Sequence, residues 1–229
     1  YVPLILKQSK VILCNSLSTA NDLHSFYKIP RKKLFPIKLG FNNKKYYPIK
    51  NIRKNFFLII GRHNPHKNLE RVIKAFALAK INNYKLVFVG SFDQRFTPSL
   101  MKLIDQLNLR HLCEWKGWID DDEKLLLLNE CHALILASLW EGFGLPALEA
   151  MACGTPVIAS ERGALPEVLD NYGYFVNPFD SESIACAMSA VINDKKCFAN
   201  ALEEGPRRAA SFNWLETARV IENIIKRIE

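Results

Sequence analysis

From residue 55 onward, short apolar runs alternate with stretches in which apolar residues recur at helical spacing. The apolar runs have the length of buried strands and lie at 55–61, 84–90, 113–119, 132–138, 155–160 and 173–178. The helical patterns lie at 68–80, 97–108, 121–130 and 180–194, and the chain beyond them is helical to its end, including 213–228. Strands that alternate with helices over short loops predict a doubly wound, Rossmann-like α/β fold with a parallel sheet.

Several of the predicted helices begin with a capping signal. Asn68 and Thr97 are the expected N-caps of two of them, and Pro98 and Pro146 suit the first turn of a helix. The acidic run 120–122 suits the positive end of the helix that follows it. We therefore interpret this run as a capping feature rather than a metal site.

The first 50 residues form a separate and shorter α/β pattern. It predicts a strand, a helix and a second strand, at 10–16, 18–27 and 34–41. The segment 42–54 is polar, basic and contains proline, which is typical of a linker. We therefore divide the chain into a first part, 1–50, and a main domain, 51–229.

Composition is that of an ordinary globular protein. The 229 residues are 49% hydrophobic and 24% charged, and no apolar run reaches the roughly 18–20 residues that a membrane-spanning helix needs. The six cysteines lie singly, without a metal-binding spacing. This usage favours buried, reduced thiols and a cytoplasmic protein.

The net charge of +8 favours an anionic partner, which could be a nucleic acid, a membrane surface or a phosphorylated ligand. Much of the excess lies in 28–38 and 42–54, and such basic runs are equally typical of a solvated linker face. We expect no nucleic acid as partner, because the chain lacks both a recognised binding motif and aromatic residues interleaved with the basic ones.

The stretch 138–160 combines two glutamates with an open glycine loop. Glu141 and Glu149 flank Gly142 and Gly144 just after a predicted strand, at the sheet edge where open α/β folds bind ligands. Backbone N–H groups that precede a helix bind anions, and ionised carboxylates accept hydrogen bonds from sugar hydroxyls. The combination predicts a ligand that carries phosphates beside hydroxyl-rich rings.

Two carboxylates alone would repel a diphosphate, so such a site also needs cations. Arg62 and Lys67 follow the strand predicted at 55–61 and therefore reach the same sheet edge. We expect the neighbouring His63 and His66 to be neutral surface residues.

These motifs together resemble those of GT-B glycosyltransferases. "GRHNPHKN" (61–68), "GWIDDDE" (117–123) and "EGFGLPALEAMACGTPVIAS" (141–160) follow the order and spacing of the donor-binding half of the retaining family 4. Upstream, "SKVILCNSLSTANDL" (9–23) and "KLGFN" (38–42) resemble what precedes that half, although "LGFN" stands where the family commonly reads "NGVD".

The resemblance covers about residues 56–195. It implies that 51–229 is the C-terminal half of a GT-B fold, which binds the nucleotide sugar. It also implies that 1–50 is a trailing piece of the N-terminal acceptor domain with the interdomain linker. On this basis we expect the chain to be a fragment whose partner domain is missing.

The resemblance also assigns roles to the matching residues, with Glu141 as the catalytic candidate. Arg62 and Lys67, directly after Gly61, would grip the diphosphate, and Glu149 would bind the ribose hydroxyls. The sugar would meet Glu141, Gly142, Phe143 and Gly144, a phosphate would meet Leu145, and the base would lie on Gly117, Trp118 and Ile119.

The implied activity is transfer of a sugar from GDP-mannose or a UDP-hexose to a glycan or lipid-linked acceptor, in polysaccharide or lipopolysaccharide synthesis. Such enzymes usually need no divalent metal, since arginine and lysine neutralise the leaving diphosphate. The implied location is the cytoplasm, with peripheral association at an anionic inner membrane face as a further expectation. A related epimerase and a non-catalytic nucleotide-sugar binder stay open as alternatives.

Four further residues are expected to serve packing. We interpret the side chains of Trp115 and Trp118 as core or rim residues and Trp214 as the anchor of the last helix. Cys153 is expected to be a buried small hydrophobe rather than a nucleophile.

Overall fold

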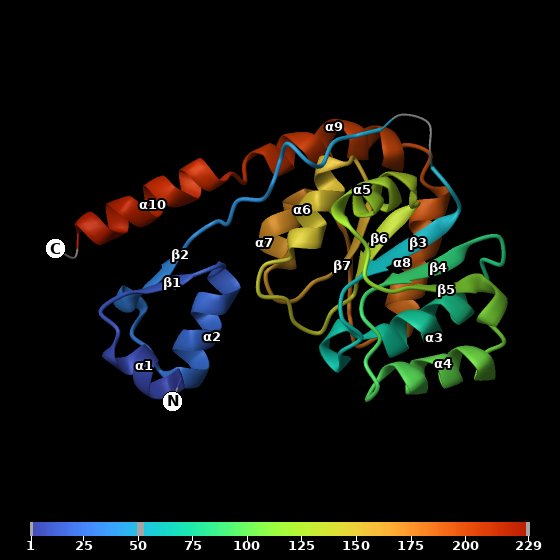
Figure 1. Cartoon of the computed structure of the whole chain (residues 1–229), viewed down its shortest axis with the longest axis horizontal. Helices are drawn as coiled ribbons and strands as arrows, with labels where there is room; N and C mark the ends of the chain where they lie inside the picture. Colours follow the sequence, from blue (N-terminus) through green and yellow to red (C-terminus); the bar gives the residue numbers. More distant parts are fainter. Residues whose placement is uncertain (1, 50–52, 228–229) are drawn as a thin grey trace.

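A six-stranded parallel sheet forms the centre of the computed structural model, which describes residues 2–49 and 53–227 (Figure 1). The strand order is β5-β4-β3-β6-β7-β8, and every neighbouring pair runs parallel. The strands are β3 (Phe56–Ile60), β4 (Lys85–Val89), β5 (Cys113–Lys116), β6 (Ala133–Leu136), β7 (Val157–Ser160) and β8 (Tyr174–Val176). The predicted doubly wound α/β fold is confirmed.

Helices cover both faces of this sheet. Successive side chains of a strand point to opposite faces, and those of the central strand are apolar on both, so both faces must be buried. Phe57 and Ile59 of β3 belong to one buried cluster and Leu58 to the other. The first face is covered by α3 (Leu69–Ala79), α4 (Thr97–Gln106) and α8 (Ser181–Asn193), and the second by α5 (Asp121–Glu130), α6 (Leu145–Ala152), α7 (Leu165–Leu169) and α9 (Cys197–Ala210).

The N-terminal part has a small sheet of its own, which lies beside the main domain (Figure 1). Its parallel strands are β1 (Ile12–Cys14) and β2 (Leu34–Pro36), with α1 (Val2–Gln8) and α2 (Leu17–Tyr27) packed around them. The final helix, α10 (Trp214–Lys226), runs back towards this part. Single 3₁₀ turns occur at Arg31–Lys33, Pro65–Lys67, Arg110–Leu112 and Asp170–Tyr172.

Of the two predicted N-caps, Asn68 is confirmed in position but makes no side-chain capping bond, and Thr97 is wrong. Asn68 precedes α3 in a left-handed conformation (φ 59°), and its side-chain amide donates instead to the carbonyls of Ala137 and Pro178. Thr97 is the first residue of α4 rather than its cap, and its hydroxyl accepts from the Asp93 N–H. For Asn68 a tertiary hydrogen bond thus replaces the local capping bond, whereas Thr97 makes a different local bond.

Other local predictions agree with the structure. Asp120 caps α5 by accepting from the Glu123 N–H, as expected for an acidic helix start. Helix α6 begins at Leu145, with Pro146 as its second residue. Cys153 is fully buried, but the prediction of buried thiols fails at Cys186, which is exposed.

The segment predicted as a linker, described at 42–49 and 53–54, is anchored to the main domain at several points although most of its residues are exposed. Tyr46 is buried, and the Ile49 N–H donates to Asn129 Oδ1 at 2.7 Å. The Arg53 guanidinium donates four hydrogen bonds of 2.6 to 3.2 Å. The acceptors are the Thr155 hydroxyl and the backbone carbonyls of Leu128, Cys131 and Gly154. Those carbonyls lie at the C-terminal ends of α5 and α6, where helix dipoles favour a cation.

Within the described part of the chain, no helix is both long and apolar enough to cross a membrane.

Replacing Arg53 tests this anchor. We expect Arg53→Met to lower the free energy of unfolding by about 2–4 kcal/mol, because it leaves several buried carbonyls without a donor. The adjacent Lys54 pairs with Glu130 on the surface, so Lys54→Met is the matched control, with an expected change below about 0.5 kcal/mol. Urea denaturation of both variants measures the difference, and equal losses would contradict the anchoring role.

Candidate functional site

The candidate site lies where the strand order reverses, at the carboxyl ends of β3 and β6. Open α/β sheets bind ligands at this kind of edge. Lys67 follows β3 and Glu141 follows β6, and Lys67 Nζ lies 2.5 Å from Glu141 Oε1. Both side chains are largely buried, with exposed fractions of 17% and 14%. The structure thus brings together a predicted phosphate-binding cation and the predicted catalytic carboxylate.

Glu141 is held from several sides. Ser138 Oγ donates to its Oε1 at 2.7 Å, the same oxygen that pairs with Lys67. Its backbone carbonyl accepts from the Ala164 N–H at 2.9 Å. Gly163 packs so closely there that an added Cβ would lie 2.6 Å from the Glu141 carbonyl oxygen. Both of these side-chain contacts go to Oε1, so Lys67 and Ser138 converge on a single carboxylate oxygen.

The glycine loop leads from Glu141 directly into α6. Gly144 has φ 99°, and a Cβ there would lie 2.7 Å from a Leu165 methyl carbon, so the position requires glycine. Phe143 is buried against Phe212 and fixes the loop to the core. Gly142 is half-buried and Leu145 is exposed at the start of the helix. The loop is therefore fixed by the buried Phe143 and Gly144, directly before the first turn of α6.

Glu149 lies one turn further along α6 and has its own cation. Its Oε1 is 2.8 Å from Lys124 Nζ of α5, and both side chains are largely buried. Burial raises the pKa of Glu149, while the Lys124 ammonium and the nearby Tyr46 hydroxyl oppose that rise. The pKa of Lys124 is raised because Glu149 and Tyr46 outweigh its own burial. We take the pair as ionised at neutral pH, since each partner stabilises the charge of the other.

The loop after β3 contains the second predicted cation. Arg62 is exposed and directly follows Gly61. Gly61 in turn packs against Gly90, where a Cβ would lie 2.0 Å from the Gly61 carbonyl oxygen, so position 90 has no room for a side chain. The prediction of a surface role for His63 is wrong: this side chain is buried, and its Nδ1 lies 2.8 Å from Thr97 Oγ1. Burial lowers the pKa of His63, in agreement with a neutral ring.

The segment expected to line a base follows β5 as a loop. Gly117 has open space on its side-chain face, and Ile119 packs on the core. The packing role predicted for Trp118 is wrong, because its side chain is 82% exposed. Trp115 behaves as predicted and stacks on Phe88, with ring centroids 4.2 Å apart. The predicted anchor Trp214 packs against Gly40 but remains 54% exposed.

The described residues contain no cluster of three or more histidine, cysteine or acidic side chains that could hold a metal ion. The acidic run 120–122 is engaged at the start of α5, where Asp120 caps the helix and Asp121 pairs with Lys45 at 2.7 Å.

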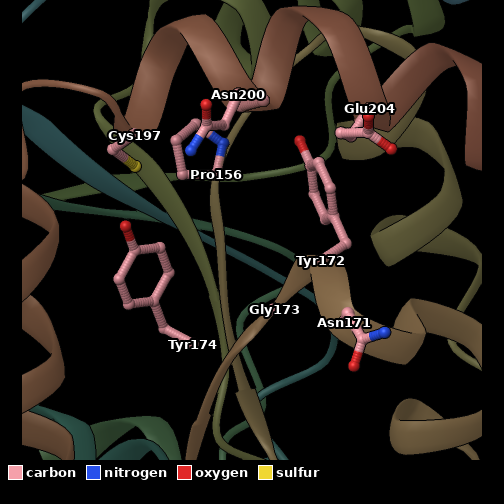
Figure 2. Close-up of a pocket in the computed structure, with 9 residues that line it drawn as sticks. Pro156, Asn171, Tyr172, Gly173, Tyr174, Cys197, Asn200 and Glu204 are labelled. Atoms are coloured by element: carbon pink, nitrogen blue, oxygen red, sulfur yellow. The ribbon is translucent and has the colours of Figure 1, made fainter.

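A separate cavity of about 380 Å³ lies between α9 and the amino ends of β7 and β8 (Figure 2). Its walls include Tyr172 and Tyr174, whose hydroxyls donate to the Thr155 carbonyl and to Asp194 Oδ2, both at 2.8 Å. None of the predicted site residues lines it. It therefore lies away from the candidate site, at the opposite edge of the sheet.

Sequence comparison places the chain in a family. Residues 43–208 match the family described as "Glycosyl transferases group 1". The chain belongs to this family. The match begins inside the segment predicted as a linker and ends in α9, so it spans the whole parallel sheet of this group 1 glycosyltransferase chain.

Similar curated proteins include mannosyltransferases. The MMP alpha-(1->4)-mannosyltransferase of Mycolicibacterium hassiacum is 27% identical over 98% of this chain and 56% of its own length. The O-antigen chain mannosyltransferase RfbU of Salmonella typhimurium is 30% identical over 81% of this chain and 52% of its own length. The chain thus spans about half the length of these relatives.

Solved structures of glycosyltransferases share the fold. Sucrose-phosphate synthase from Thermosynechococcus elongatus matches 99% of this chain and 60% of its own, with a TM-score of 0.87 and 25% identity. HepE from Anabaena, solved in complex with UDP and glucose, matches 99% of this chain and 65% of its own, with a TM-score of 0.89 and 20% identity. These neighbours confirm the resemblance to GT-B glycosyltransferases.

Two residues of the site were missed from the sequence. Ser138 ends the strand predicted at 132–138 and follows five apolar residues, a position that could have marked it. Lys124 gave no such signal, because it lies 25 positions from Glu149 on a different helix. The contact between Lys67 and Glu141 confirms that these two predicted site residues lie together. Their roles in binding the diphosphate and the sugar remain predictions.

Removing Lys124 should leave Glu149 as a buried, unpaired carboxylate. We expect Lys124→Met to lower the free energy of unfolding at neutral pH by about 3 kcal/mol and to raise the pKa of Glu149 further. A carboxyl whose pKa is raised by folding contributes stability that is lost as the pH rises through the folded pKa. The loss should therefore be larger at neutral pH than at acid pH, as measured by urea denaturation.

Lys116→Met is the matched control, because Lys116 pairs with Glu123 at a more exposed position. A Lys124→Met deficit that stays constant between acid and neutral pH would contradict the assignment of Lys124 as the counter-cation of Glu149.

Proposed function

We propose that this chain is the sugar-donor half of a retaining glycosyltransferase and binds a nucleotide diphosphate sugar at the carboxyl edge of the parallel sheet. The proposal rests above all on the contact between Lys67 and Glu141 at the point where the strand order reverses. A cation that grips a diphosphate and a carboxylate that meets the sugar must lie side by side, since the scissile bond joins these two parts of the ligand.

Each part of the ligand has a matching group. Arg62 and Lys67 would neutralise the diphosphate, and the loop N–H groups at the start of α6 would bind its oxygens. Glu141 would hold the sugar, and Glu149 would accept hydrogen bonds from the ribose. Because two cationic side chains are available for the leaving group, we also propose that no divalent metal is required.

The reaction would exchange one bond of the sugar for another. The bond from C1 to the diphosphate oxygen breaks, and a bond from C1 to the acceptor oxygen forms on the same face. The acceptor proton passes to the leaving diphosphate, so Glu141 need not form a covalent adduct. Its carboxylate would orient the sugar and stabilise the positive charge that develops on the ring.

Mannosyltransferases among the relatives support GDP-mannose as the donor, and the neighbour solved with UDP and glucose supports a UDP-hexose. A thermal-shift panel of GDP-, UDP- and ADP-sugars separates these donors, since a ligand at 100 times its dissociation constant stabilises the folded state by about 2.7 kcal/mol.

The proposed acceptor is a glycan or a lipid-linked sugar. Peripheral binding at an anionic membrane face is tested by sedimentation with phosphatidylglycerol vesicles, and no binding would exclude it.

Loss of either proposed phosphate cation should weaken donor binding. We expect Arg62→Ala and Lys67→Ala each to raise the dissociation constant by about 10- to 100-fold, because each removes a charge-assisted contact. Calorimetry with GDP-mannose and UDP-glucose measures the dissociation constant. Adding EDTA should leave that constant unchanged if no divalent metal is required. Arg110→Ala, at an exposed site away from this edge, is the control. Unchanged affinity in both variants would contradict the assignment of Arg62 and Lys67 to the diphosphate.

Glu141→Gln should separate catalysis from binding. It keeps the shape of the side chain but removes its charge, so turnover should fall by more than about tenfold while donor affinity changes little. Glu149→Gln should instead act mainly on affinity. Steady-state kinetics on the protein in its natural full length, with donor binding followed separately, tests both. Wild-type turnover in Glu141→Gln would exclude a catalytic role, and epimer formation without transfer would favour the related epimerase.

A further inference from the structure

Trp140 lies directly before the candidate catalytic residue and is only half-buried, with an exposed fraction of 47%. Its indole packs over Gly142, since a Cβ at that glycine would lie 3.1 Å from Trp140 Cη2. A tryptophan packed in this way restricts the backbone on both sides of Glu141. The side chain contributes little as a core residue, because nearly half of it faces solvent.

The indole also reaches the N-terminal part of the chain. Trp140 Nε1 donates to Asp22 Oδ2 of helix α2 at 2.8 Å, across 118 positions of sequence. A second contact joins the same helix to the same loop, as Thr19 Oγ1 lies 3.5 Å from the carbonyl oxygen of Gly142. Two side chains of helix α2 therefore contact the glycine loop, one at the Trp140 indole and the other at the Gly142 backbone carbonyl.

Helix α2 is itself fixed to the main domain. The N–H groups of Leu17 and Ser18, in its first turn, donate to the two carboxylate oxygens of Glu167 at 2.9 and 3.1 Å. Glu167 belongs to α7, which directly follows the Gly163–Ala164 contact with Glu141. The helix and the loop are thus held from one common support, so the bond between Asp22 and Trp140 has a defined geometry.

From these contacts we infer that Trp140 and Asp22 are positioning residues that hold the Glu141 loop in its reactive placement. The inference rests on the proposed function. A single hydrogen bond at the surface adds little to the stability of the fold, whereas a small displacement of a reacting group costs much in rate. The N-terminal part thus contributes to the chemistry of the sugar-donor site through helix α2.

The test removes the bond from each side. Trp140→Phe keeps an aromatic ring over Gly142 but lacks the N–H, and Asp22→Ala lacks the acceptor. We expect each to lower kcat for transfer from GDP-mannose or UDP-glucose by about tenfold, with the dissociation constant of the donor within about twofold of wild type. The double variant should also lose about tenfold rather than 100-fold, because both changes delete the same bond.

Asp22→Asn retains an oxygen that can accept from the indole and should restore most of the turnover. Trp214→Phe is the matched control, because Trp214 is similarly exposed but packs at Gly40, away from the loop. Its kcat should equal that of wild type, and all variants should melt at the wild-type temperature.

Wild-type kcat in Trp140→Phe and Asp22→Ala, or additive losses in the double variant, would overturn the inference. An equal loss of donor affinity and turnover would overturn it as well. If these variants are unaffected while Glu141→Gln loses turnover, the inference fails and the proposed function stands. A full-length protein that transfers no sugar from either donor overturns both.

Discussion

The parallel order of the central strands is the constraint on which the candidate site depends. Neighbours of β3 run outward through β4 and β5 on one side and through β6, β7 and β8 on the other. The loops after β3 and β6 must therefore diverge to opposite faces, and a gap opens between them at the carboxyl edge. Lys67 and Glu141 face each other across this gap. Any reversal of β3 or β6 would send one of the two residues to the opposite edge.

Two largely buried ion pairs occur at and near the candidate site, and burial limits what each adds to the stability of the fold. Lys67 with Glu141 and Lys124 with Glu149 form two ion pairs whose side chains are all less than 20% exposed. Removing such charges from water costs about as much as their attraction returns, so buried pairs are weak stabilisers. Removing one member of a pair would nevertheless be costly, because it leaves the other charge buried and unpaired.

Close backbone contacts give the site its rigidity. Glycines at positions 90, 144 and 163 occupy places where a Cβ would meet neighbouring atoms at less than 3 Å. At the C-terminal ends of α5 and α6, the Arg53 guanidinium donates to the Leu128 and Gly154 carbonyls. Segments that looked like loops and a linker are thus packed against their neighbours. The placement of Glu141 is consequently fixed by the fold as a whole.

Sequence alone determined the alternation of strands and helices, the sheet edge of the candidate site, and the approach of Lys67 to Glu141. These follow from periodicity, from glycine and proline positions, and from the rule that parallel strands share one edge. Only the tertiary structure paired Lys124 with Glu149, directed Asn68 to two carbonyls instead of a cap, and brought Asp22 to Trp140 across 118 positions. Such contacts depend on which helices dock side by side, and docking is decided by packing between distant segments that leaves no local pattern.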